Sequence, residues 1–334
     1  MQTRSVGPFE VSAIGFGCMG LSSGYGPPTP RERAEAVLRA ALDAGHSFFD
    51  TAAVYGLGGN ESLVAEVLGP HRAKFTLASK CGITVGDQRQ IDGSPANLKD
   101  TCERSLRRLK TEVIDLYYLH RWDKRVPIEE SVGALAELVA EGKIRAIGLS
   151  EVSAATLRRA HAAHPITALQ NEYSPWTRNP ELGVLEACRE LGVAFVAFSP
   201  VGRGFLAGGA SDPARFGEGD MRANMPRFQG EALQANRKLL ERFAAVARDA
   251  GCTPAQLCLA WLLAKDPIIV PIPGTTNPDH VRENAAAGDI ALSAEVLARV
   301  DRIVNGDTVS GSRYPPALQA VVDTERMPSE MEPA

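Results

Sequence analysis

Short apolar segments alternate with longer segments of helical period along most of the chain, and this pattern restricts the possible folds more than any other feature. The apolar segments are rich in β-branched and aromatic residues and are almost uninterrupted, as expected of parallel strands buried on both faces. Eight strands are predicted: Ala13–Gly17, Ser47–Asp50, Phe75–Lys80, Val113–His120, Arg145–Ser150, Thr167–Glu172, Ala194–Ser199 and Ile268–Ile272. The predicted helices are one with Thr29 as N-cap, Pro30 at its first position and Gly45 at its end, then Glu61–Leu68, Pro95–Leu109, Ile128–Glu141, Ala154–His161, Leu182–Glu190, Pro254–Ala264 and Pro278–Ala286. Eight strands, each followed by a helix, predict a (β/α)8 barrel, with a doubly wound open sheet as the alternative.

Some segments of the chain lie outside the eight strand-helix units. Ser5–Val11 is expected to form an N-terminal hairpin, and the Gly/Arg/Phe-rich stretch Gly204–Asn236 a long loop that runs into an extra helix at Glu231–Ala250. A further helix is predicted at Ser293–Val304, followed by an irregular, proline-rich tail from Asn305 to Ala334. Because no linker separates two cores, we expect one domain over residues 1–334, with a barrel core at about 12–290 and a helix and tail at 291–334.

Composition excludes several classes of protein. The net charge of −4, from 36 basic and 40 acidic residues, gives no footprint for nucleic acid. The six cysteines are scattered without a C-x-x-C pair, which favours reduced thiols. No apolar run reaches the roughly 18 residues of a membrane span, and the first residues lack the apolar stretch of a signal peptide. A cytoplasmic protein without a nucleic-acid or membrane partner is therefore expected, and the sequence assigns no oligomeric state.

Gly15, Gly17 and Gly20 match the G-x-G-x-x-G fingerprint of dinucleotide-binding folds. That motif has meaning only where a helix begins at its last glycine. Here residues 21–28 read LSSGYGPP, which is not a helical sequence. We therefore interpret the motif as a first strand followed by a glycine-rich loop at the mouth of a barrel.

Ionisable residues end several of the predicted strands, where barrel enzymes carry their chemistry. Asp50, Lys80 and His120 end the second, third and fourth strands, and Tyr55 follows on the loop after Asp50. A nearby ammonium favours a phenolate, so Lys80, oriented by Asp50, is expected to lower the pKa of Tyr55 from about 10 toward neutrality. Tyr55 would then protonate an oxygen that gains charge while His120 hydrogen-bonds to it. This set suits reduction of a carbonyl and needs a hydride donor such as a nicotinamide.

Each of these residues, taken singly, also has a structural explanation. Asp50 could be a turn residue, Tyr55 a loop aromatic, Lys80 a solvated strand end and His120 a structural histidine. Their joint placement at neighbouring strand ends favours the catalytic interpretation.

At these positions the sequence resembles the aldo-keto reductase family, in its bacterial and plant branch of aldehyde and ketone reductases. The similar stretches follow the family's order: FFDTAAVYG at Phe48–Gly56, Ser79-Lys80, IDLYYLH at Ile114–His120, IRAIGLSE at Ile144–Glu151, LQNEYS at Leu169–Ser174, FSPVGRGFL at Phe198–Leu206, PIPGT at Pro271–Thr275 and Glu283-Asn284. The resemblance implies an NADPH-dependent reductase in which Tyr55 donates the proton, Asp50 and Lys80 activate it and His120 orients the substrate.

The resemblance also implies an extended cofactor site across the barrel mouth. Ser150 and Gln170 would hold the nicotinamide carboxamide, and Phe198 would stack on the ring. The pyrophosphate loop would contain Ser199, Gly202 and Arg203, and the adenosine half Gly274, Thr275, Glu283 and Asn284. Family members often carry a basic residue after PIPGT for the 2′-phosphate of NADP, whereas this chain has Thr276, Asn277, Pro278 and Asp279. Arg282 and His280 are the candidate replacements, and use of NADH stays possible.

The substrate pocket is less constrained by sequence. Tyr25, Cys81, Trp122, Trp176 and the tail near Tyr314 are candidates, and the ammonium of Lys80 could favour a thiolate at Cys81, with a buried inert thiol as the alternative. A metal site is not expected, because His161 and His164 lack further ligands nearby in sequence, and the absence of a G-x-S-x-G motif argues against a hydrolase. Two other functions stay open: a cofactor-binding regulatory module like the family's channel-associated members, and a non-redox barrel lyase or isomerase.

Overall fold

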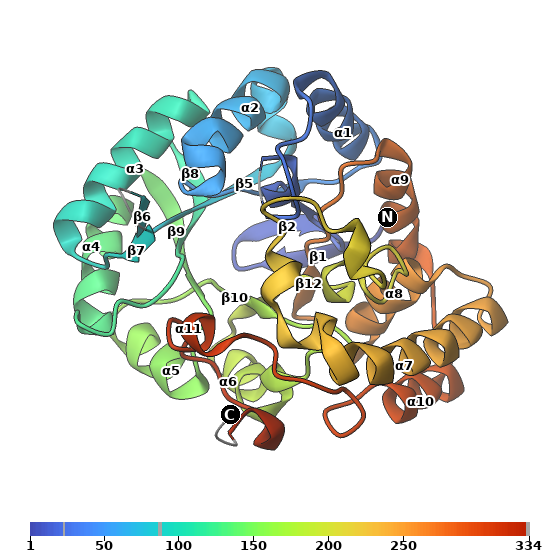
Figure 1. Ribbon diagram of the computed structural model, residues 1–334. Helices are drawn as coiled ribbons and strands as arrows, with labels where there is room; N and C mark the ends of the chain where they lie inside the picture. Colours follow the sequence, from blue (N-terminus) through green and yellow to red (C-terminus); the bar gives the residue numbers. More distant parts are fainter. Residues whose placement is uncertain (23, 86–88, 332–334) are drawn as a thin grey trace.

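The computed structural model describes residues 1–22, 24–85 and 89–331 of the chain. In these residues one sheet of eight parallel strands runs in the order of the sequence, and the helices form a ring around it (Figure 1). The strands of this sheet are β3 (Phe16–Gly17), β4 (Phe48–Asp50), β5 (Thr76–Cys81), β8 (Ile114–Leu119), β9 (Ile144–Ser150), β10 (Ala168–Glu172), β11 (Ala194–Phe198) and β12 (Ile269–Pro271).

Backbone hydrogen bonds between the first and last strands close the sheet into a barrel. The N–H of Gly15 donates to the carbonyl of Pro271 over 2.9 Å, and that of Gly17 to Pro273 over 3.1 Å. A Cβ atom at Gly17 would lie 2.8 Å from the carbonyl oxygen of Ile272, so glycine is needed for this close approach. The (β/α)8 barrel is thereby confirmed and the open-sheet alternative is wrong. Gly15 and Gly17 of the G-x-G-x-x-G motif lie at the seam between the first and last strands, and Gly20 belongs to a 3-10 turn, η1 (Met19–Leu21), rather than to the start of a helix.

The helices around the barrel match the predicted segments closely. They are α1 (Arg31–Asp43), α2 (Gly59–Leu68), α3 (Pro95–Leu109), α4 (Ile128–Ala140), α5 (Ala154–Ala163), α6 (Val184–Leu191), α8 (Pro254–Lys265) and α9 (Pro278–Ala286). The predicted cap of α1 is wrong: Pro30 is the N-cap, and the hydroxyl of Thr29 donates instead to the carbonyl of Gly20 over 3.3 Å. Helix α6 begins two residues later than predicted, because residues 179–182 form a 3-10 turn that ends at Gly183.

Apolar side chains fill both the barrel and the space between strands and helices. The interior contains Phe48 and Tyr118, each fully buried. Val6 and Val11 pack with them from the hairpin of β1 (Thr3–Val6) and β2 (Phe9–Ser12), so the predicted hairpin plugs one end of the barrel. A larger cluster lies between the sheet and the helices. The opposite end, where the parallel strands finish, is left for polar residues.

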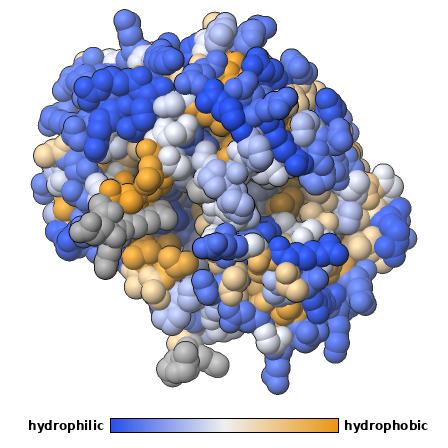
Figure 2. Space-filling model, turned by 45° about the horizontal axis from the view of Figure 1, so that its top comes forward, coloured by the Kyte–Doolittle hydropathy of each residue, from blue (hydrophilic) through white to orange (hydrophobic). Residues whose placement is uncertain are grey.

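Three additions surround that end. A hairpin of β6 (Ile83–Val85) and β7 (Arg89–Ile91), not predicted from sequence, follows β5. The long loop after β11 leads into α7 (Gly230–Asp249), as predicted. Beyond α10 (Ala294–Ile303), the tail forms the short helix α11 (Pro316–Gln319) and lies across the β10 side of the barrel near α5 and α6 (Figure 1). The surface seen in Figure 2 is mostly hydrophilic, with smaller hydrophobic patches, and no helix among the described residues is long and apolar enough to cross a membrane.

Candidate active site

Asp50, Lys80 and Tyr55 meet at the ends of β4 and β5. The ammonium of Lys80 is completely buried and forms an ion pair with the carboxylate of Asp50, which is itself 3% exposed. The same Nζ donates to the carbonyl of Thr51 over 2.8 Å and to the Tyr55 hydroxyl over 3.3 Å. The structure therefore brings together three of the residues that the sequence analysis selected.

Backbone contacts hold the loop that carries Tyr55. The N–H of Ala53 donates to the carbonyl of Lys80 over 3.1 Å, and the N–H of Tyr55 to Ala52 over 3.1 Å. The buried amide of Asn60 accepts from the Thr51 hydroxyl over 2.6 Å. These bonds fix the start of the loop against β5, so the tyrosine hydroxyl reaches the lysine.

Burial and charge act in opposite directions on this pair. Burial alone would lower the pKa of Lys80, but the Asp50 carboxylate and Tyr55 raise it above its ordinary value. For Tyr55, burial raises the pKa and outweighs the lowering effect of the Lys80 ammonium. The expected net fall of the Tyr55 pKa toward neutrality is wrong, because desolvation of the phenolate is the larger effect. Tyr55 is thus protonated at neutral pH, beside a permanent positive charge.

His120 completes this group. It follows β8, is 6% exposed, and its backbone N–H donates to the carbonyl of Cys81 over 2.9 Å. Its ring meets the Tyr55 ring edge-on, with centroids 5.8 Å apart. The imidazole and the phenol are therefore neighbours at the mouth of the barrel.

Asp50, Tyr55, Lys80 and His120 form a tetrad. The polar ends of β9 and β10 lie beside it. Ser150 is 1% exposed and its Oγ accepts from Arg121 over 3.1 Å. Gln170 donates from Nε2 to Asp50 Oδ2 over 2.8 Å, which ties the predicted carboxamide residue directly to the buried ion pair. The next residue, Asn171, accepts from the backbone N–H of Glu151 over 2.7 Å.

The loop after β11 has an unusual backbone. Ser199, Gly202 and Arg203 all adopt positive φ angles, of 50°, 59° and 56°. Such conformations cost energy outside glycine and cluster at ligand-binding sites. A Cβ atom at Gly202 would lie 2.9 Å from the ring of Trp176, so the residue is confined to glycine. Phe198 is partly exposed, and the Arg203 guanidinium lies 6.0 Å from the centre of its ring.

The side chain of Arg203 is engaged by other residues. Its Nη2 donates to Glu172 Oε2 over 2.5 Å and to the hydroxyl of Tyr314 over 3.1 Å. Burial would raise the pKa of Glu172, but Arg203 and the buried Arg313 and Arg227 lower it. The predicted pyrophosphate ligand is thus paired with a carboxylate here.

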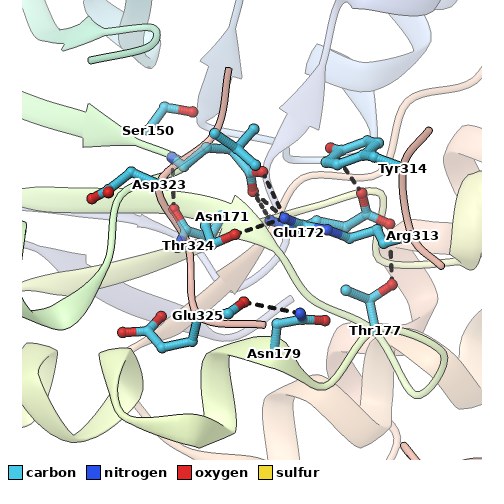
Figure 3. A network of polar contacts seen from close by, with 12 residues as sticks. Ser150, Asn171, Glu172, Thr177, Asn179, Arg313, Tyr314, Asp323, Thr324 and Glu325 are labelled. Carbon is cyan, nitrogen blue, oxygen red and sulfur yellow. Dashed lines mark hydrogen bonds and ion pairs between the residues drawn. The ribbon is translucent and has the colours of Figure 1, made fainter. Parts of the chain in front are cut away.

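The tail takes part in this buried network (Figure 3). Arg313 is 1% exposed and pairs with the fully buried Glu151 over 3.2 Å. Its Nη2 also donates to Thr324 over 2.7 Å, and the carboxylate of Asp323 accepts from Thr156 over 2.7 Å at the start of α5. A segment expected to be irregular is in fact anchored by charge to the ends of β9 and β10.

The predicted adenosine residues lie where β12 leads into α9. Gly274 packs against Gly17, where a Cβ atom would lie 2.8 Å from the Gly17 oxygen. Thr275 Oγ1 lies 3.4 Å from His280 Nδ1. Glu283 accepts from the Thr253 hydroxyl, and Asn284 is 7% exposed.

Charges on the first two turns of α9 are exposed. Arg282 pairs with Asp279 over 2.8 Å, and Asn277 caps the helix by accepting from the N–H of Asp279 over 3.0 Å. Arg33, from α1, donates to the carbonyl of Thr276 over 2.7 Å. This cation was missed in the sequence, because 243 residues separate it from the carbonyl that it contacts.

Two of the pocket candidates are buried among apolar side chains, and for Cys81 the pocket prediction is wrong. Cys81 follows Lys80 on β5, and alternation along the strand turns its side chain out of the barrel into the apolar layer beneath the helices. Burial raises the pKa of its thiol, so the Cys81 thiolate is excluded as well. Trp176 is 3% exposed and stacks on Phe205, with ring centroids 4.4 Å apart.

The other pocket candidates lie on the rim. Trp122 donates from its indole N–H to the carbonyl of Val126 over 2.9 Å and carries the Arg159 guanidinium over its ring. Tyr25 packs beneath Arg222 of the long loop, 4.8 Å from ring centre to guanidinium. A residue missed by the sequence reading, Arg121, donates to Ser150 beside the tetrad; its position directly after His120 was the available signal.

Comparisons with known proteins identify the family of the chain. The model of the Aldo/keto reductase family matches residues 13–305. A probable aldo-keto reductase 1 of Glycine max is 45% identical over 309 residues, covering 92% of this chain and 89% of the relative.

Solved structures are similar over most of the chain. A glycerol dehydrogenase of Gluconobacter oxydans superimposes with a TM-score of 0.81 at 27% identity, covering 90% of this chain and 94% of the other. An aldo/keto reductase of Klebsiella pneumoniae, solved in complex with NADP and acetate, gives a TM-score of 0.68 at 31% identity over 88% and 92% of the two chains. With a family model matched over most of its length and a 45% identical relative, this chain belongs to the aldo/keto reductase family.

Proposed function

We propose that this oxidoreductase reduces aldehydes or ketones to alcohols with NADPH, and that Tyr55 donates the proton. The observation that carries the proposal is the buried Lys80 ammonium, which contacts both the Asp50 carboxylate and the Tyr55 hydroxyl. A phenol held 3.3 Å from a fixed positive charge is suited to release a proton to a neighbouring oxygen.

The charge arrangement favours donation over acceptance. Tyr55 starts protonated, because burial raises its pKa. When its proton moves to a carbonyl oxygen, the Lys80 ammonium stabilises the phenolate that remains. Asp50 keeps Lys80 charged, since the ion pair offsets the effect of burial on its pKa. Gln170, bonded to Asp50, fixes the orientation of that carboxylate.

His120 lies at the other side of the phenol. With its ring edge-on to Tyr55, it can donate a hydrogen bond to the oxygen that Tyr55 protonates. Two donors converging on one oxygen both orient the carbonyl and stabilise the charge that develops on it.

The residues around the mouth fit a nicotinamide dinucleotide, which supplies the hydride when bound. Ser150 offers a buried hydroxyl beside the tetrad for the carboxamide. The positive-φ loop at Ser199–Arg203 suits close approach of the backbone to a phosphate. Family membership and the NADP in the Klebsiella pneumoniae relative support this assignment.

Preference for NADPH rests on basic residues near α9. Arg282 is paired with Asp279, so its charge is largely balanced. Arg33 and His280 border the same turn through Thr276 and Thr275, and we assign the 2′-phosphate to them together with Arg282. The basic residue missing after Thr275 is thus replaced by one from α1.

Steady-state turnover tests the proposal. The purified protein is mixed with NADPH or NADH and a reactive aromatic aldehyde such as 4-nitrobenzaldehyde. Oxidation of the cofactor is followed as the loss of absorbance of the reduced nicotinamide at about 340 nm. Many turnovers per molecule, faster with NADPH, are expected. A single turnover of bound cofactor would point to the regulatory module instead, and no binding of NADPH would point to non-redox chemistry.

A further inference from the structure

Arg121 places a guanidinium beside the tetrad. It directly follows His120 and its Nη1 donates to the His120 carbonyl over 2.6 Å and to Ser150 Oγ over 3.1 Å. The guanidinium therefore spans from the end of β8 to the end of β9 at the mouth of the barrel. It is near enough to Tyr55 that its charge lowers the pKa of the phenol, against the larger effect of burial.

This cation lacks a counter-charge within the described ranges 1–22, 24–85 and 89–331. Across those residues Arg121 forms no ion pair, and its Nε and Nη2 make no hydrogen bond. The carboxylates around the mouth form ion pairs with other residues: Asp50 with Lys80, Glu151 with Arg313 and Asp123 with Arg125.

Other arginines near the mouth differ from Arg121 in this respect. Arg203 is paired with Glu172, and Arg313 with Glu151. These two are buried, whereas Arg121 is partly exposed. An arginine that reaches solvent with a free edge of its planar fork is the kind of group that binds carboxylates in a bidentate manner.

We propose that Arg121 binds a carboxylate of the substrate, and that the preferred substrates are aldehydes or ketones that also carry a carboxylate. The inference rests on the proposed reductase function and names the substrate class of the same site. With the carbonyl oxygen between Tyr55 and His120, the carboxylate lies on the β8–β9 side, where the free Nε and Nη2 of Arg121 complete its hydrogen bonds.

The test compares two substrates that differ only in charge, 4-carboxybenzaldehyde and methyl 4-formylbenzoate. We expect the wild-type protein to prefer the acid, mainly through a lower KM. Arg121→Gln should reduce the acid-to-ester ratio of kcat/KM by about 10- to 100-fold, the range expected for a charged hydrogen-bonded contact. Arg121→Lys, which keeps the charge without the fork, should retain part of the preference.

A matched control and a binding measurement complete the design. Arg125→Gln removes the same charge from the same loop, but Arg125 is paired with Asp123 and 75% exposed, so the acid-to-ester ratio should stay unchanged. Terephthalate, which has carboxylates and no aldehyde, should inhibit reduction of the ester, with a Ki that rises at least about tenfold in Arg121→Gln.

The outcomes separate this inference from the function beneath it. If the wild-type protein reduces neither aldehyde, the proposed reductase function fails. If it reduces both equally well, or if Arg121→Gln weakens NADPH binding and lowers both rates in parallel, the carboxylate role of Arg121 is overturned. Should Arg121→Gln not fold, the ratio in Arg121→Lys and terephthalate inhibition of the wild type decide the question.

Discussion

Replacing Asp50 by Asn should expose how strongly the buried ion pair is coupled. The change keeps the shape of the side chain but leaves the fully buried Lys80 ammonium without its counter-charge. Removing one partner of a buried pair costs about 3–5 kcal/mol of unfolding free energy. Because Lys80 keeps its bond to the Thr51 carbonyl and its contact with Tyr55, we expect the lower end, about 3 kcal/mol at neutral pH.

The pH dependence gives this prediction its sign. In the wild type the pKa of Lys80 is raised above its unfolded value, so its contribution is fully present at lower pH and is lost only as pH rises through the folded pKa. Without Asp50, burial is the dominant influence and lowers that pKa, so the variant gains relative stability as Lys80 loses its proton. The stability difference between wild type and variant should therefore shrink between about pH 6 and about pH 9.5.

Urea denaturation at both pH values measures the effect. The double variant Asp50→Asn/Lys80→Met should recover at least about 2 kcal/mol relative to the sum of the single changes, because both charges are then gone. Asp279→Asn, in an exposed pair, serves as the control and should change stability little. A loss below about 1 kcal/mol in Asp50→Asn, or additive single changes, would refute the reasoning.

Two further predictions concern the closure of the barrel between β3 and β12, and the C-terminal tail. Gly17→Ala places a Cβ atom 2.8 Å from the Ile272 oxygen and should destabilise the barrel by about 1–3 kcal/mol. Gly133→Ala, in the middle of α4 where no neighbouring atom would meet the new Cβ, should stabilise the protein by about 0.5–1 kcal/mol. Equal midpoints of thermal unfolding for the two variants would contradict the close approach of the first and last strands at Gly17. Arg313→Met leaves the buried Glu151 carboxylate without its counter-charge and should lower the unfolding free energy by about 3–5 kcal/mol, measured by urea denaturation. Arg326→Met, at an exposed position on the same tail, should lower it little. Similar urea curves for the two variants would show that this pair does not anchor the tail.

Much of the fold was accessible from the sequence because strands buried on both faces and helices of regular period leave strong local signals. An ion pair between residues far apart in the chain leaves no such local signal in the sequence. The tail reads as irregular because its order comes from Arg313 meeting Glu151, 162 residues away. The β6–β7 hairpin was missed because its strands are three residues long. The boundaries of the domain stay a prediction.

The proximity of candidate residues could be predicted where they share neighbouring strand ends, but the direction of an individual side chain could not. Lys80 and Cys81 are adjacent in sequence, yet one faces the barrel interior and the other the helix layer. Trp176 looked like a pocket wall, but its ring fills an aromatic cluster under the long loop. The direction of the Tyr55 pKa shift also depends on burial, which residue identity alone does not report. The roles of the cofactor residues stay predictions.

The most direct test of the account is Tyr55→Phe, measured in two ways on the same sample. Removing the hydroxyl takes away the proton donor while leaving Asp50, Lys80 and the cofactor residues in place. NADPH should still quench the protein fluorescence with nearly the wild-type Kd, and kcat with 4-nitrobenzaldehyde should fall by about 10²- to 10⁴-fold. Turnover within about fivefold of the wild type would contradict Tyr55 as the donor.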